Sequence, residues 1–332
     1  PWNFPLMIGA WKIAPALAAG NSVVLKPAET ASLSLLRLAE LALEAGVPDG
    51  VFNVVTGTGA IAGEALALSM DVDMLVFTGS GAVGRQLLQY SAQSNLKRVY
   101  LELGGKSPNI VFADVPDLDF AASVSAAGIF RNSGQVCIAG SRLLVQQEIH
   151  DEFVAAVADK AAAMQVGDPL DLNSQIGAVN SLPQLEKDLQ FVEQASKEGA
   201  ELVTGGQRIL QESGGYYMSP TVMTGVKPDD KLSRDEVFGP ILAVTPFNDE
   251  TDAIRLANNS VYGLSAGVWT QNLSRAHRMV HQVRAGIVHV NTYGGSDLTV
   301  PLGGVKQSGN GHDKSLHALD KYYDLKSAWI QL

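Results

Sequence analysis

The segment Met74–Gly105 reads MLVFTGSGAVGRQLLQYSAQSNLKRVYLELGG and joins two short apolar runs through a glycine-rich turn and a helical stretch. The first run is Met74–Phe77, and the second is Arg98–Leu103. Runs of nearly continuous apolar character are typical of strands that are buried on both faces of a parallel sheet. Two such strands joined through a helix predict a right-handed crossover between parallel strands. The segment therefore indicates an α/β fold.

The same alternation extends towards the N-terminus. Two more strand candidates are Ser22–Leu25 and Phe52–Val55, and the stretch between them, Ala31–Ala45, has leucines at helical spacing. Pro1–Pro5, in contrast, looks like the end of a strand that enters a turn. Strand candidates that alternate with helices predict a doubly wound, Rossmann-like parallel sheet, which we assign to residues 1–104.

A second α/β unit follows the pair Gly104-Gly105, which we take as the domain boundary. Its expected helices are Leu118–Phe130, Ile149–Met164 and Leu182–Glu198, and its expected strands are Leu143–Val145, Ile241–Thr245 and Gly267–Trp269. We assign residues 105–320 to this second domain, together with the segment by which the chain returns from it before the tail. Residues 321–332 look like a separate tail that ends in a short apolar strand candidate, Ala328–Leu332.

The composition suits a folded protein of two lobes. A chain of 332 residues exceeds the usual size of one core, and 46% hydrophobic against 17% charged residues argues against disorder. The 24 basic and 34 acidic residues give a net charge of −10 without a basic stripe, which argues against a nucleic-acid partner. No stretch approaches the ~18 apolar residues of a membrane span. A single cysteine allows no intrachain disulfide and fits a cytoplasmic protein, and no residues have metal-ligand spacing.

Cys137, the only cysteine, lies in the glycine-flanked loop NSGQVCIAG, residues 132–140. A lone cysteine is often a small buried hydrophobic residue. Glycines on both sides also permit the close approach of a ligand, as a nucleophile requires. Because a thiol has a pKa of about 8.5, a nucleophilic cysteine needs a base or a positive field nearby. The loop by itself leaves both interpretations open.

Two further residues suit acid–base or oxyanion chemistry. Glu102 lies at the carboxyl end of a strand candidate, where open α/β sheets place their sites. It is either a partner of Lys106 in an ion pair or a general base whose pKa is raised by apolar surroundings. Asn3, within the PWNFP turn, is either a turn former or an amide donor to an oxyanion.

Several residues suit a nucleotide cofactor. Gly79, Ser80 and Gly84 lie in a turn that follows a strand and opens a helix, a setting that suits a phosphate. Lys26 and Glu29 follow another strand and either bind ribose hydroxyls or form a solvated turn. A carboxylate at such a position disfavours the additional phosphate of NADP.

Two downstream residues, Glu236 and Phe238, suit a second ribose of a dinucleotide and the flat ring attached to it. Glu236 and Phe238 are two residues apart, so in an extended segment both side chains point to one face. On that face they would hold a ribose and a flat ring.

Seven motifs in order, PWNFP, KPAE, FTGS, ELGGKSPN, GQVC, EVFGP and PLGGVKQSG, resemble the aldehyde dehydrogenase superfamily along the whole chain. The resemblance implies a cofactor domain in residues 1–104, a catalytic domain in residues 105–320 and an oligomerisation strand in residues 321–332. It also implies NAD-dependent oxidation of an aldehyde, with NADP as a possible cofactor, by a cytoplasmic homo-oligomer, dimeric or tetrameric.

The same resemblance gives each site residue a role. It implies that Cys137 is the nucleophile, Glu102 the general base and Asn3 an oxyanion-hole donor. The residues expected at the cofactor are Lys26, Glu29, Gly79, Ser80, Gly84, Glu236 and Phe238.

The most similar subgroup is that of bacterial γ-glutamyl-γ-aminobutyraldehyde dehydrogenases of putrescine catabolism. The tail KQSGNGHDKSLHAL, residues 306–319, and the segment SNLKR, residues 94–98, carry this resemblance. We expect Trp11, Arg131 and Asp297 at the substrate. Asp297 would attract a cationic amino group or is a solvated loop residue, whereas Arg131 would favour a carboxylate. An enzyme for succinate semialdehyde, or one of broad specificity, is the alternative.

The chain departs from the family pattern in three respects. Family members begin well upstream of Pro1, so we expect the sequence to be incomplete at its N-terminus. His312 stands where arginine is usual, and Arg131 where an aromatic residue is common. These departures leave open an inactive, truncated nucleotide-binding protein.

Overall fold

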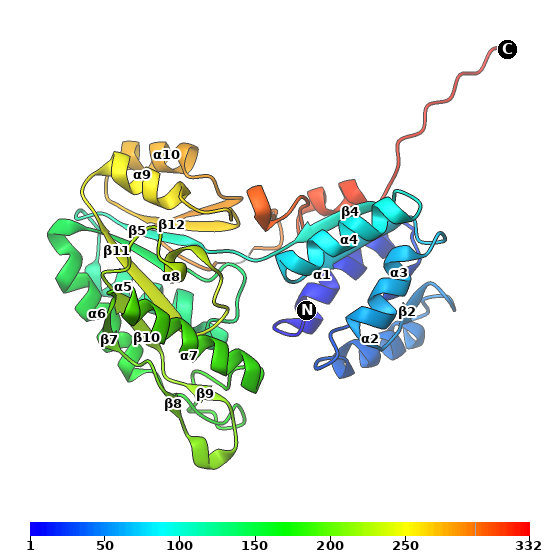
Figure 1. Ribbon diagram of the computed structural model, residues 1–332. Coiled ribbons are helices and arrows are strands. Elements are labelled where there is room, and N and C mark those ends of the chain that lie inside the picture. The colour runs from blue at the N-terminus through cyan, green and yellow to red at the C-terminus, as the bar shows by residue number, and fades with distance from the viewer. Residues whose placement is uncertain (296) are drawn as a thin grey trace. The chain divides into compact units, whose positions relative to one another are not determined.

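The computed structural model describes residues 1–295 and 297–332, and these form two compact units (Figure 1). The first unit contains Pro1–Leu103, residues 297–303 and Gly309–Leu332. The second unit contains Gly104–Gly295 and Gly304–Ser308. The segment after Gly309, which we assigned to the second domain, therefore clusters with the first unit. It is attached there by antiparallel bridges between Gly309 and Glu102 and between Leu302 and Asp313.

The strands of the first unit form two parallel pairs. β1 (Val23–Leu25) pairs with β2 (Phe52–Val54), and β3 (Met74–Thr78) pairs with β4 (Arg98–Glu102). α2 (Leu33–Glu44) and α4 (Gly81–Gln93) connect the strands of each pair, so the expected strand–helix–strand order is confirmed. The single doubly wound sheet is not found, because no hydrogen-bonded ladder joins the two pairs within the described residues.

The first unit begins with a helix that the sequence analysis did not predict. Residues 3 and 4 form a bend, and α1 (Pro5–Ala18) follows directly, so the interpretation of PWNFP as a strand end was wrong. Proline is well suited to the first helical position because its fixed φ matches the helix and no partner is needed for its nitrogen. The remaining elements of this unit are η1 (Gly59–Gly63), α3 (Glu64–Leu68) and η6 (Leu316–Lys321).

A seven-stranded sheet forms the centre of the second unit, in the order β13-β12-β5-β6-β11-β10-β7. Neighbouring strands are parallel except for β7, which is antiparallel to β10. The strands are β5 (Pro108–Val111), β6 (Arg142–Gln146), β7 (Glu201–Thr204), β10 (Thr221–Thr224), β11 (Ile241–Phe247), β12 (Ser265–Trp269) and β13 (Ile287–Val290). A separate short hairpin contains β8 (Arg208–Ile209) and β9 (Tyr217–Met218).

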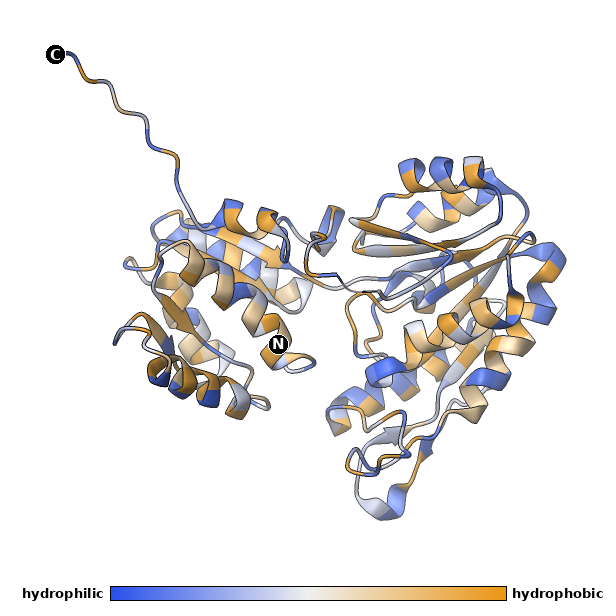
Figure 2. Cartoon of the chain, turned by 180° about the vertical axis from the view of Figure 1, so that it is seen from behind, coloured by the Kyte–Doolittle hydropathy of each residue, from blue (hydrophilic) through white to orange (hydrophobic). Residues whose placement is uncertain are grey.

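Helices cover both faces of this sheet. On one face, α5 (Leu118–Phe130) and α6 (His150–Ala163) pack against Leu143 and other inward side chains of the strands. On the other, α9 (Glu250–Asn258) and α10 (Leu273–Gln282) pack against a second core that includes Leu144. Figure 2 shows the strands as mainly hydrophobic and the outer helix surfaces as hydrophilic, as expected for a buried sheet. The other elements are η2 (Arg131–Gly134), η3 (Gln147–Ile149), α7 (Leu182–Lys197), η4 (Gln211–Ser213), α8 (Lys231–Arg234) and η5 (Lys306–Ser308).

The C-terminal tail carries neither a helix nor a strand after Tyr323. Within it, Leu325, Trp329, Ile330 and Leu332 are almost fully exposed. The strand expected at Ala328–Leu332 therefore has no partner within the described part of one chain. A strand requires a neighbouring strand for its hydrogen bonds, so this expectation remains a prediction about an assembly. No described helix combines the length and apolar character that crossing a membrane requires.

Candidate active site

The loop that carries Cys137 is held in an unusual backbone conformation. It follows α5 through η2, where Asn132, Ser133 and Gly134 have φ values of 51°, 56° and 71°. Ser133 Oγ donates a hydrogen bond to the Gly177 carbonyl at 2.7 Å, which fixes this turn. Cys137 itself is half-buried, not enclosed in the core. A nucleophile needs such access, whereas a purely structural thiol does not.

Cys137 and Glu236 both lie against the glycine pair Gly104-Gly105. A Cβ at Gly105 would lie 2.5 Å from the carbonyl oxygen of Cys137, so only glycine permits this contact. The Gly105 N–H donates to Glu236 Oε1 at 3.0 Å, and a Cβ at Gly104 would collide with the same carboxylate. Burial raises the pKa of Glu236, and the Gly105 hydrogen bond and Lys106 oppose this rise. Two residues expected in one site are thus neighbours within the second unit.

The segment that carries Glu236 and Phe238 is not extended. Phe238 has a φ of 62°, so the alternation of side chains that an extended segment would give does not apply here. Helix α7 holds the segment instead. Gln184 Nε2 and Lys187 Nζ both donate to the Val237 carbonyl, at 2.9 and 3.1 Å.

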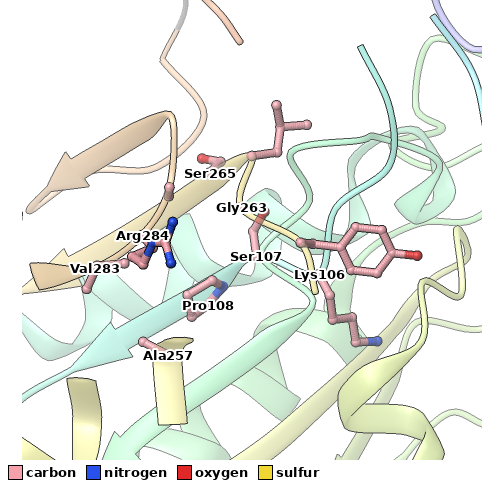
Figure 3. A pocket seen from close by; sticks show the side chains of 11 residues that line it. Lys106, Ser107, Pro108, Ala257, Gly263, Ser265, Val283 and Arg284 are labelled. Carbon is pink, nitrogen blue, oxygen red and sulfur yellow. The ribbon is translucent and has the colours of Figure 1, made fainter. Parts of the chain in front are cut away.

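Lys106, between this segment and β5, is fully buried, with a side chain that is 1% exposed. It lines a small hollow with Ser107 and Arg284, and its chain extends away from Pro108 and Arg284 (Figure 3). Burial lowers its pKa to about 7, with Arg142 as a further cause. Its amino group has no hydrogen-bond partner within the described residues.

In the first unit, Glu102 ends β4 and is 5% exposed. Neither of its carboxylate oxygens has a hydrogen-bond partner among the described residues, so the ion-pair alternative with Lys106 gains no support. Burial raises the pKa of Glu102 well above its usual value; Lys12 opposes the rise and Asp313 adds to it. A carboxylate whose pKa is raised binds a proton more readily than an ordinary carboxylate, which suits a general base.

A cluster of buried charges that the sequence analysis missed acts on Glu102. Asp313 contacts Lys12 from α1 and Lys321 from η6, and its side chain is 1% exposed. Lys321 Nζ donates to Asp313 Oδ1 and to the His312 carbonyl, both at 2.7 Å. A lysine within the apolar stretch MIGAWKIAPALA was the available signal, but α1 itself had not been predicted.

The expected substrate residues have different surroundings. Trp11 lies on α1, with Lys314 Nζ 5.8 Å from its ring centre. Asp297 is exposed, and its Oδ1 accepts hydrogen bonds from the nitrogen and hydroxyl of Thr299, both at 2.8 Å. These bonds lower the pKa of Asp297, so it is charged at neutral pH. Asn3 lies in the bend before α1, and Arg131 is exposed at the start of η2.

The phosphate-type turn has the expected geometry. Ser80 caps α4, its Oγ accepting a hydrogen bond from Val83 N at 3.3 Å. Gly84 allows α4 to pack closely on the end of β4, because a Cβ there would lie 2.9 Å from Leu103, the residue that follows the strand, and 3.4 Å from Leu101 within it. Gly79 likewise has no room for a side chain, since a Cβ would lie 2.4 Å from the Phe77 ring.

Lys26 and Glu29 lie close together after β1, with Nζ and Oε1 3.7 Å apart. Glu29 Oε1 also accepts a hydrogen bond from Gly59 N at 2.6 Å. Glu29 lines an open hollow with Pro5 and residues 30–34. Glu29 therefore borders a space that is open to a ligand.

A family model described as the aldehyde dehydrogenase family matches residues 1–328. The chain belongs to the aldehyde dehydrogenase family. The resemblance inferred from the seven motifs is therefore confirmed. The chain spans about two thirds of the length of the curated relatives that it matches.

Individual members of the family are very similar to the chain. The NADP/NAD-dependent aldehyde dehydrogenase PuuC of Escherichia coli K12 is 54% identical over all of the chain and 66% of its own length. A solved structure of γ-glutamyl-γ-aminobutyraldehyde dehydrogenase from Burkholderia cenocepacia is 55% identical, with a TM-score of 0.96 over 98% of this chain and 66% of that one. An indole-3-acetaldehyde dehydrogenase in complex with NAD⁺ is 53% identical, with a TM-score of 0.98 over 100% and 67%. The expected fold class is confirmed, and the subgroup resemblance is supported.

The residues in place are compatible with a dinucleotide such as that of the aldehyde dehydrogenase family. Thr78 Oγ1 is buried without a hydrogen-bond partner within the described residues, immediately before the Gly79-Ser80 turn. The amino-terminal end of α4 adds a favourable field for a phosphate. Lys26 and Glu29 lie in the same unit as this turn, with Nζ and Oε1 3.7 Å apart.

Proposed function

We propose that the complete gene product oxidises an aliphatic aldehyde to its carboxylic acid with NAD as cofactor and Cys137 as nucleophile. The observation that carries this proposal is the half-buried Cys137 in a strained loop that packs against Gly105, whose N–H binds Glu236. Family membership and the name of the E. coli relative support it.

The proposed chemistry assigns one task to each residue. The Cys137 thiolate attacks the aldehyde carbon, and the resulting oxyanion accepts hydrogen bonds from Asn3 and the Cys137 N–H. Loss of one such donor typically raises the barrier by roughly 3–4 kcal/mol. NAD, when bound, would supply the acceptor for the hydride of the former aldehyde carbon. Loss of this hydride would leave a thioester on Cys137. Glu102 then takes a proton from water as the water attacks the thioester, and the acid leaves.

The decisive test is the formation of NADH by the complete gene product with propanal and NAD. We expect Cys137→Ser to abolish it and Cys137→Ala to retain NAD binding. Wild-type turnover by Cys137→Ser would contradict the assignment. Binding of NAD without any turnover by the wild type would favour the alternative of an inactive nucleotide-binding protein.

We propose an ω-amino or γ-glutamylamino aldehyde as the substrate, with Trp11, Arg131 and Asp297 near its tail. Two names support this class: that of the solved B. cenocepacia enzyme, and that of an aminoacetaldehyde dehydrogenase of Pseudomonas aeruginosa, which is 49% identical. The indole-3-acetaldehyde enzyme at 53% identity shows that similar chains accept other aldehydes. Arg131 is exposed beside the Cys137 loop, which favours a carboxylate-bearing aldehyde such as succinate semialdehyde as the second candidate.

A comparison of kcat/KM values distinguishes these substrates. 4-Aminobutyraldehyde, its γ-glutamyl derivative, succinate semialdehyde and propanal would be tested with wild type, Arg131→Ala and Asp297→Ala. A loss confined to carboxylate-bearing aldehydes in Arg131→Ala assigns that residue to the substrate. Equal losses for all four aldehydes in Asp297→Ala would remove Asp297 from substrate recognition.

Three further properties belong to the same proposal. Glu29 disfavours the additional phosphate of NADP, so Glu29→Gln should bind NADP more tightly relative to NAD. We also propose a homo-oligomer, dimeric or tetrameric, because the tail exposes several large apolar side chains. A cytoplasmic location is proposed because a chain with a single cysteine suits a reducing compartment.

A further inference from the structure

Tyr293 lies three residues after the end of β13, and the intervening Asn291 holds the backbone in one conformation. Asn291 has a φ of 51°, and its side-chain amide both accepts from Thr270 N and donates to Thr270 O, each at 3.0 Å. These bonds tie the end of β13 to the end of β12. The chain therefore leaves the sheet along a defined path, and Tyr293 is buried two residues later.

The Tyr293 ring occupies a space that three glycines leave open. A Cβ at Gly128 of α5 would lie 3.0 Å from Tyr293 Cδ1, and one at Gly267 of β12 would lie 2.6 Å from Cδ2. A Cβ at Gly140, in the loop after Cys137, would lie 3.2 Å from Cζ. The ring is thus enclosed by a helix, a strand and the loop of the nucleophile.

The hydroxyl of Tyr293 reaches the residue that follows the nucleophile. It donates a hydrogen bond to the Ile138 carbonyl at 2.7 Å. Burial raises the pKa of Tyr293, so the phenol remains protonated and donates throughout the neutral range. Two other hydrogen bonds hold the part of the loop before Cys137. Ser133 Oγ donates to the Gly177 carbonyl, and Gln135 Oε1 accepts from Asn180 N.

We propose that Tyr293 is a positioning residue for Cys137, fixing the peptide after the nucleophile through its bond to Ile138. This inference rests on the proposed function, because it requires Cys137 to be the nucleophile. The ring fixes the distance of the loop from α5 and β12. The hydroxyl fixes the orientation of the peptide group that follows Ile138, because it binds the Ile138 carbonyl. The sulfur thereby keeps one orientation while bonds form and break at the aldehyde carbon.

Tyr293→Phe tests the proposal because it retains the ring between the three glycines and removes only the hydroxyl. The complete gene product would be mixed with NAD and propanal, and the first turnover of NADH formation followed. We expect its rate to fall about tenfold, since small displacements of a reacting atom are costly. We also expect the deuterium isotope effect with [1-²H]propanal to increase, with the affinity for NAD unchanged.

Tyr217→Phe is the matched control, because Tyr217 is a buried tyrosine of β9 in the same unit. It should leave the first-turnover rate and the isotope effect unchanged. A purely structural role of Tyr293 would lower the thermal midpoint without changing the isotope effect, and this result would overturn the proposal. Wild-type kinetics in Tyr293→Phe would overturn it as well. Failure of the wild type itself to form NADH would instead count against the proposed function.

Discussion

Lys321 Nζ donates a hydrogen bond to Asp313 Oδ1 at 2.7 Å, and both side chains are almost completely buried. Asp313 also contacts Lys12, so one carboxylate bridges two ammonium groups. Burial is the main cause of the raised pKa of Glu102, and both lysines oppose it. The state of the proposed base therefore depends on a cluster contributed by α1 and η6.

Lys321→Met should move the acid limb of the pH–rate profile to higher pH. Removal of a positive charge raises the pKa of Glu102 further, and a base acts only in its deprotonated form. Activity that is lost as the pH falls would then be lost at a higher pH than in the wild type. The measurement is kcat against pH with saturating NAD and propanal.

The exposed Lys197, paired with Glu193 on α7, provides the control for this charge change. Lys197→Met removes the same charge at the surface and should leave the pH profile unchanged. An acid limb that stays in place in Lys321→Met would show that the cluster does not act on the proposed base.

Gly105→Ala should abolish activity. The new Cβ would lie 2.5 Å from the carbonyl oxygen of Cys137, so either the loop of the nucleophile or the Glu236 contact has to move. The matched control is Gly177→Ala, because that position has nothing within 4 Å of an added Cβ. NADH formation and NAD affinity would be measured for both variants. Activity of Gly105→Ala close to that of the wild type would contradict this close packing of Gly105 against Cys137.

Local patterns in the sequence were sufficient for part of the fold, because they did not mark β5, β7, β10, β13, α9 or α10. Periodicity located β3, β4, α5 and α7 because each is a continuous run with a clear apolar pattern. α1 was missed because its first residue is the proline of a motif that resembles a turn. The division of the parallel strands into two pairs was not predictable, since sheet pairing depends on contacts distant in sequence.

The candidate site was predictable only in part. Cys137, Glu102 and Glu236 belong to motifs that can be read along the chain. Asp313 and Lys321 could not be linked to Glu102 from sequence, because about two hundred positions separate them and only folding makes them neighbours. The positive φ of Phe238 was equally hidden, since nothing in the sequence marks a phenylalanine for the left-handed region.

Removal of residues 325–332 should reduce the size of the assembly. These residues expose Leu325, Trp329, Ile330 and Leu332, and large exposed apolar groups of this kind mark interfaces. Sedimentation of the complete gene product with and without the segment would measure the change. Trp329→Asp should have the same direction of effect, because it places a charge in the proposed interface. An unchanged sedimentation coefficient for both variants would exclude the tail from assembly.

Lys106→Met should raise the thermal midpoint near neutral pH. The amino group is buried, and its pKa in the folded chain is about 7, below the usual value of 10.5. The unfolded chain therefore binds a proton more readily, and the lysine disfavours folding by an amount on the order of a few kcal/mol below pH 7. This penalty decreases as the pH rises from about 7 towards 10.5, because the unfolded lysine then also loses its proton. Methionine has a similar length and no charge, so its advantage should be largest at pH 6 and smallest near pH 10. Thermal unfolding of both proteins across this range is the measurement, and a lower midpoint of Lys106→Met at every pH would show that the amine is stabilised by contacts of its own.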